Sequence, residues 1–280
     1  MADPAAESEK TPAASLVCDS VEEPFLTGAA RRQVRQTFRA LRHRNFRLFL
    51  GGQIVSLIGT WMQSTAQSWL VYRLKHSELL LGTAWFCTQI PVFALGPLGG
   101  LAADRYSRHR IVLCTQTLSM LQAAALAGLT LSGVVTFAEV LALAVALGCI
   151  NAFDMPGRNS LLIEMTGKED LLNAVSLNST TFNVARVAGP AIAGFLVAAV
   201  GEGVCFALNA ASFMAVIAGL LAMRLPPRLL ERSPDSPWVH LKEGFRYAWR
   251  RQPVRRILSD RKSTRLNSSH IQKSRMPSSA

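Results

Sequence analysis

Residues 79–102 read LLLGTAWFCTQIPVFALGPLGGLA, an apolar run without a single acidic or basic side chain. A helix of about 20 apolar residues crosses the hydrocarbon core of a bilayer, so this run predicts a membrane span. A membrane β-barrel would instead show alternating segments of about ten residues. Outward from this run, similar apolar segments occupy 47–73, 111–133, 138–157, 173–200 and 203–224. We therefore expect an all-α membrane protein with a six-transmembrane-helix bundle over 46–224.

The composition of the 280-residue chain fits a lipid environment: 50% of residues are hydrophobic and 17% are charged. A soluble domain would carry about 25% charged residues. The net charge of +12 raises the possibility of nucleic-acid binding. However, the basic residues lie in blocks between the apolar segments, which is typical of the cytoplasmic loops of membrane proteins. We expect the lipid bilayer, and no nucleic acid, as a partner.

The orientation follows from charge in the connections. The amino-terminal arm, the loops at 104–110 and 158–172 and the segment after 224 carry Arg or Lys, whereas the opposite connections are short and poor in basic residues. Because basic residues favour the cytoplasmic side, this multi-pass bundle is expected to have both ends in the cytoplasm.

Three polar segments flank the bundle. Residues 1–45 predict a disordered cytoplasmic tail that ends in a basic surface helix. Residues 225–260 predict an amphipathic linker helix on the cytoplasmic membrane surface, with packing on another part of the protein as the alternative. Residues 261–280 predict a further disordered tail and resemble translated sequencing-adapter tails, so we expect an artefact there and assign it no folding role.

The loop after the first quoted span reads Gly100-Leu-Ala-Ala-Asp104-Arg105-Tyr-Ser-Arg108-His-Arg110. Asp104 stands at the predicted membrane edge, where a carboxylate can accept hydrogen bonds from a helix amino terminus or pair with Arg108. Gly96 and Gly100 form a GxxxG pair, which predicts close packing of this helix on a neighbour. The plain alternative is a basic loop with one acid.

This loop resembles motif A of the major facilitator superfamily, with Ser107 where the family usually has Gly. The resemblance implies two inverted three-helix repeats, here 47–133 and 138–224, and transport by alternating access. It also implies that the motif latches the two halves of a transporter together in one state. The gating residues would be Gly100, Asp104, Arg105, Arg108 and Arg110.

Residues 183–194 read NVARVAGPAIAG, similar to a shortened form of the Gly-Pro motif in the fifth helix of superfamily antiporters. That resemblance points to export and rests on Arg186, Gly189, Pro190 and Gly194. A charge within a membrane span is costly and usually faces a cavity or a partner. Arg186 is therefore expected either to bind anionic or polar substrate groups in a cavity or to pair with Asp154 or Glu164.

The stretches at 45–53, 151–158 and 173–178 resemble one bacterial subgroup, which includes enterobactin-type siderophore exporters and macrolide-type drug exporters. The resemblance implies a bacterial cytoplasmic (inner) membrane protein, with a small-molecule substrate and protons as partners. The expected function is proton-coupled export of amphipathic small molecules. Candidate cavity or coupling residues are Gln53, Gln63, Asn151, Asp154 and Arg186.

The sequence shows no catalytic constellation, no clustered metal ligands and no nucleotide-binding GxxxxGK[ST] motif. We therefore expect neither an enzyme nor a cofactor nor a metal, and we expect energy from an ion gradient. The resemblance covers only half of a transporter, so the missing carboxyl-terminal half or a second copy is expected to complete it. The alternatives are a solute importer of the same fold and a non-transporting, half-size membrane scaffold.

Overall fold

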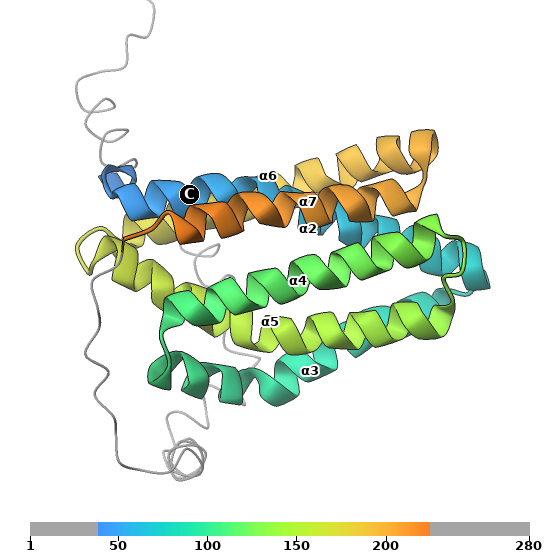
Figure 1. Cartoon of the computed structure of the whole chain (residues 1–280), viewed down its shortest axis with the longest axis horizontal. Helices are drawn as coiled ribbons and strands as arrows, with labels where there is room; N and C mark the ends of the chain where they lie inside the picture. The colour runs from blue at the N-terminus through green and yellow to red at the C-terminus, as the bar shows by residue number, and fades with distance from the viewer. Residues whose placement is uncertain (1–38, 225–280) are drawn as a thin grey trace, which may run out of the picture.

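The computed structural model describes residues 39–224, and six long helices account for most of them (Figure 1). A short 3-10 helix, η1 (Arg39–Arg42), precedes them, and the described part contains no strand. This confirms the all-helical prediction. The predictions for the tail before residue 39, the linker and the segment 261–280 lie outside the described residues. The long helices are α2 (Arg44–Lys75), α3 (Glu78–Arg105), α4 (Arg108–Leu131), α5 (Phe137–Thr166), α6 (Leu171–Val200) and α7 (Glu202–Leu221).

Five of these helices, α3 to α7, are long and apolar enough to cross a membrane. The exception is α2, because its 32 residues include three glutamines and several serines and threonines. Three of its polar side chains, Gln53, Ser56 and Gln63, are buried within the protein. The prediction of six apolar spans is thus confirmed for five of the helices. In the sixth, α2, some of the polar side chains point into the bundle.

The helices contact one another in the order α6, α2, α7, α4, α5, α3, each packing mainly on the next (Figure 1). This order is symmetric along the chain. If α2, α3 and α4 are matched to α5, α6 and α7, each contact has a counterpart. The contact between α2 and α6 corresponds to that between α5 and α3, and the contact between α2 and α7 corresponds to that between α5 and α4. The contact between α4 and α7 is turned into itself. The first three and the last three helices are therefore packed equivalently.

The closest approach between α3 and α5 depends on glycines other than the predicted pair. A Cβ added to Gly99 would lie 2.0 Å from the carbonyl oxygen of Ala152, and one added to Gly148 would lie 2.3 Å from that of Thr88. A Cβ at Gly96 or Gly100 would meet nothing within 4 Å. Within residues 39–224 the GxxxG pair Gly96 and Gly100 therefore makes no close helix contact. Since a helix turns about 100° per residue, Gly99 faces α5 while Gly100 faces away from it.

The helix α5 is longer than predicted. We expected a loop over 158–172, but α5 continues through Pro156 to Thr166, and only residues 167–170 join it to α6. Its 30 residues extend about 45 Å, more than the roughly 30 Å of hydrocarbon. The last turns can therefore project beyond the membrane core, where polar side chains are tolerated.

Candidate functional site

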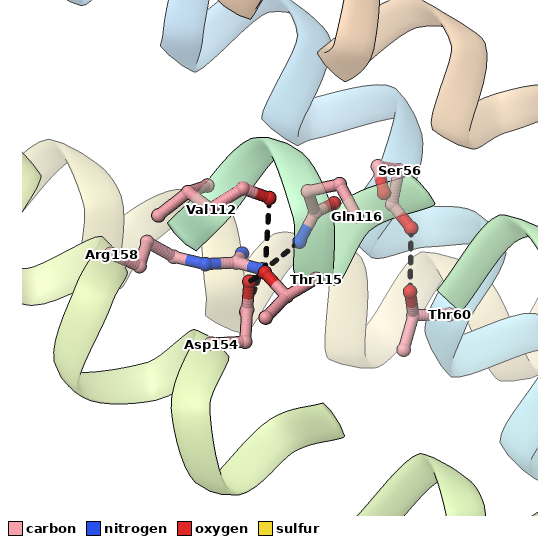
Figure 2. Close-up of polar contacts among 7 residues, drawn as sticks. All are labelled: Ser56, Thr60, Val112, Thr115, Gln116, Asp154 and Arg158. Atoms are coloured by element: carbon pink, nitrogen blue, oxygen red, sulfur yellow. Dashed lines mark hydrogen bonds and ion pairs between the residues drawn. The ribbon is translucent and has the colours of Figure 1, made fainter. Parts of the chain in front are cut away.

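A buried carboxylate on α5 is the centre of the first polar cluster. The side chain of Asp154 is only 5% exposed. Its Oδ1 accepts hydrogen bonds from Thr115 Oγ1 at 2.7 Å and from Gln116 Nε2 at 2.8 Å, both on α4, and its Oδ2 pairs with the Arg158 guanidinium one turn along α5 (Figure 2). A buried charge is stable only when it is paired and hydrogen-bonded, and Asp154 has both kinds of partner.

The hydroxyl of Thr115 has a second acceptor within reach. Its Oγ1 lies 3.0 Å from the carbonyl oxygen of Val112 as well as 2.7 Å from Asp154 (Figure 2). A hydroxyl donates one proton and accepts on its lone pairs, so Thr115 can donate to either oxygen. When it donates to Val112, it can accept a hydrogen bond from a protonated Asp154.

Two buried side-chain acceptors have no hydrogen-bond partner among the described residues. They are Oε1 of Gln116, whose Nε2 is bonded to Asp154, and Oε1 of Gln53 on α2. An unsatisfied buried acceptor typically costs about 1–3 kcal/mol. Gln53 was predicted as a cavity or coupling residue, and its side chain is buried inside the bundle.

The second polar cluster joins three helices through side-chain amides. Asn209 of α7 donates to Gln63 of α2 at 2.6 Å, and Gln63 donates to Gln122 of α4 at 3.2 Å. Gln122 in turn donates to the carbonyl oxygen of Leu143 on α5 at 3.3 Å. Gln63, another predicted cavity residue, therefore holds helices together in this structure. Asn151 is half-buried, three residues before Asp154.

Arg186 is exposed on α6 and lies over the indole ring of Trp61 on α2, 5.6 Å from the ring centroid. The predicted ion pair with Asp154 or Glu164 is wrong, because Asp154 pairs with Arg158 and no carboxylate within 39–224 forms a salt bridge with Arg186. Phe182 meets the same indole edge-on, with ring centroids 5.5 Å apart.

The remaining residues of the fifth-helix motif differ in their packing. A Cβ on Gly189 would lie 2.5 Å from the Cβ of Trp61, so this glycine allows α6 to approach α2. Gly194 has nothing within 4 Å of such a position. Pro190 lies within the continuous helix α6 and is half-buried.

The predicted gating loop joins α3 to α4 and exposes Asp104 and Arg110. No salt bridge joins Asp104 to Arg108. Instead, Arg108 donates to the carbonyl oxygens of Ala103 at 3.4 Å and Ser160 of α5 at 3.3 Å. The turn does not need the glycine of the family motif, because Ser107 has φ −60°, in the region that every residue adopts. Arg105 is also exposed.

Other polar contacts fix the ends of α7. His109 Nε2 lies 2.8 Å from the carbonyl oxygen of Leu220, and Asn45 bonds both backbone groups of Arg224. At the opposite end, Arg73 of α2 forms a salt bridge of 3.2 Å with Glu202. The buried carboxylate at the first turn of α7 is thus compensated by an exposed guanidinium.

Sequence reasoning missed Thr115, Gln116 and Gln122 on α4. All three are polar residues inside the apolar segment 111–133, and that contrast is the signal that could have found them. The salt bridge between Arg73 and Glu202 has no local signal, because the two residues are far apart in the chain.

A family model and several known transporters match this chain. The model of the transmembrane secretion effector family matches residues 35–271. The staphyloferrin A transporter of Staphylococcus aureus is 29% identical over 189 residues, which cover 67% of this chain and 47% of that protein. The multidrug efflux pump Tap of Mycolicibacterium fortuitum is 28% identical over 222 residues, covering 76% and 54%.

The enterobactin exporter EntS of Shigella boydii is 27% identical over 210 residues, covering 73% of this chain and 49% of that protein. The chain thus spans about half the length of the curated relatives it matches. Five apolar helices agree with a multi-pass membrane protein. The chain belongs to the transmembrane secretion effector family of the major facilitator superfamily.

Proposed function

We propose that the chain supplies the amino-terminal, six-helix half of a proton-coupled exporter of amphipathic small molecules. Family membership supports transport, and the names of the relatives describe a siderophore transporter, a siderophore exporter and a drug efflux pump. The observation that carries the proposal is the buried, charged cluster around Asp154 in a helix apolar enough to cross a membrane. Ionisable groups in such helices are expensive and usually functional.

In this proposal α2 also crosses the membrane, although it is the least apolar of the six helices. It lies between α6 and α7 and buries Gln53, Ser56 and Gln63 inside the bundle, so these polar groups are kept from lipid. The segment η1, the α3–α4 turn and the end of α7 lie at one end of the bundle (Figure 1), and each of these segments carries or is followed by basic residues. That end is the cytoplasmic one by the positive-inside rule, in a bacterial inner membrane.

Alternating access would use the two packed triplets α2–α4 and α5–α7 as inverted repeats. Their equivalent contacts support this assignment, because such repeats build many transporter folds. The proposed mechanism also needs a completing half, either the missing carboxyl-terminal half or a second copy. Gly100 has open space around it, which would let a helix of that half approach beside the gating residue Asp104.

Asp154 is the proposed proton acceptor. Protonation would remove its ion pair with Arg158, and the hydroxyl of Thr115 could turn from Asp154 to Val112 and accept the new proton's hydrogen bond. The cluster joins α4 to α5, so a change in the charge of Asp154 would alter the contact between two helices. Coupling by this route links a proton to a helix movement.

The proposal is tested in inside-out bacterial membrane vesicles that carry the product of the complete source reading frame. The extent of that frame is established by sequencing the source DNA across the codons for Leu258 to Ala280. Accumulation of enterobactin or ethidium in the vesicles, driven by an acid interior and abolished by collapsing the pH gradient, is the expected result. Vesicles that contain the protein and accumulate neither probe would overturn the proposal.

A further inference from the structure

Arg186 lies at the midpoint of its helix. It is 15 residues after Leu171 and 14 residues before Val200, so about 22 Å of helix separates it from either end. It is the only residue of α6 with a charged side chain. In a helix that crosses the bilayer, this position is near the centre of the hydrocarbon.

The surroundings of Arg186 do not neutralise it. The side chain is exposed, and no carboxylate among residues 39–224 forms a salt bridge with it. An arginine guanidinium stays charged in proteins, so Arg186 cannot become neutral as a buried Lys or carboxylate can. A permanent charge at this depth usually faces the bundle interior or a water-filled cavity, or pairs with an opposite charge or a backbone carbonyl group, rather than facing lipid.

The position of the guanidinium is set by its neighbours. It lies over the face of the Trp61 indole, 5.6 Å from the centroid. Phe182 meets the same indole edge-on, and Gly189 lets α6 approach α2 at the Cβ of Trp61. A cation–π contact uses the ring face of the indole and leaves the N–H groups of Arg able to donate to an acceptor.

The exposed face of α6 around Arg186 carries both polar and apolar side chains. Phe182 is exposed, and Asn183, one turn before Arg186, is exposed with its Nδ2 bonded to Ser179 of its own helix. This leaves the amide oxygen of Asn183 directed to no described partner. A cation beside two aromatic rings fits a ligand with an anionic group and an apolar, flat body.

We infer that Arg186, Trp61 and Phe182 form a binding site for the carboxylate end of an amphipathic anion. The inference rests on the proposed function, because it adds carboxylate-bearing amphipathic anions to the ligands of the exporter. The guanidinium binds the carboxylate in a bidentate pair, and the indole and phenyl rings contact the apolar part of the ligand.

The test compares two ligands of nearly the same shape, 1-naphthaleneacetate and its neutral amide, 1-naphthaleneacetamide. Equilibrium dialysis against the 280-residue chain in lipid nanodiscs gives a dissociation constant for each. A charge-assisted bidentate pair is expected to favour the acid about tenfold over the amide. In Arg186→Met the preference disappears, while affinity for the amide stays within about twofold; in Trp61→Leu both affinities fall.

The matched control is Lys75→Met, which removes an exposed cation at the end of α2 and should leave the tenfold preference intact. Thermal unfolding of each variant shows that it remains folded, and Arg186→Lys should recover part of the preference. Equal binding of acid and amide by the unaltered chain, or an unchanged preference in Arg186→Met, overturns the inference. Failure of transport in vesicles with the preference intact would instead count against the proposed function alone.

Discussion

The Cα of Gly99 on α3 faces the carbonyl oxygen of Ala152 on α5 so closely that a methyl group on Gly99 would lie 2.0 Å from this oxygen. The two helices meet backbone to backbone at this point. Packing of this kind replaces a hydrophobic driving force between membrane helices, because lipid tails are as apolar as the side chains. The contact sits just two residues before Asp154, so it also sets the position of the proposed coupling group.

Substitution Gly99→Ala is therefore expected to destabilise the protein by about 1–3 kcal/mol, because backbone cannot move aside as a flexible side chain can. The free energy of unfolding is measured by titration with sodium dodecyl sulfate, followed by circular dichroism. The matched control is Gly82→Ala on the same helix, where a Cβ meets nothing within 4 Å and stability should be unchanged or slightly raised. Equal effects at both positions would contradict the packing described.

A second prediction concerns the hydrogen bond between the side-chain amides of Asn209 and Gln63. Asn209→Ala leaves Oε1 of Gln63 buried without its donor, so unfolding should become easier by about 1–2 kcal/mol. A double-mutant cycle with Gln63→Ala isolates the interaction, for which about 0.6–2 kcal/mol is expected within a membrane. Asn183→Ala is the control, since Asn183 bonds only its own helix on an exposed face. A coupling energy of zero would mean that the hydrogen bond does not join α2 to α7.

The two partners of the salt bridge between Arg73 and Glu202 differ in burial, because the side chain of Arg73 is 55% exposed and that of Glu202 is 5% exposed. Arg73→Met leaves a buried carboxylate uncompensated and should cost more stability than Glu202→Gln, which leaves only an exposed cation. Adding Glu202→Gln to Arg73→Met should restore part of the loss. Detergent unfolding of the three variants measures this. Equal costs for both single variants would argue against burial of Glu202.

The overall architecture was predictable because it depends on short-range properties of the chain. The lengths of the apolar runs predicted the all-helical bundle, and the structure confirms five of the spans. The polar side chains of α2, which lower its apolarity, are the same ones that its neighbours bury, so composition alone could not decide that helix. The end of α5 was placed too early because a membrane helix can project past the hydrocarbon.

The details of the candidate site were less predictable, since they depend on how helices face one another. The pair Asp154–Arg158 has the i, i+4 spacing that favours a contact along one helix. The donors Thr115 and Gln116 come from another helix, and Arg186 contacts Trp61, a residue far from it in the sequence. A GxxxG pattern likewise identifies small residues without saying which face meets the neighbour, and here the contact falls on Gly99.

Asp154→Asn changes the proposed proton acceptor with little change in shape. The amide keeps an acceptor for Thr115 and Gln116 but cannot take up a proton at neutral pH, so transport against a gradient should fall at least tenfold. Glu164→Gln, on the same helix but with no salt bridge within 39–224, is the matched control and should transport normally. Western blotting of the vesicles shows whether both variants reach the membrane at normal levels.

Proton movement coupled to substrate is the most direct test of the account. In inside-out vesicles carrying the complete reading frame, an acid interior is established and its pH is followed with a fluorescent dye while enterobactin or ethidium is added. The account predicts that adding a transported probe raises the interior pH with the unaltered protein and with Glu164→Gln, but not with Asp154→Asn. A probe that accumulates without any change in interior pH, or an equal change with Asp154→Asn, would contradict it.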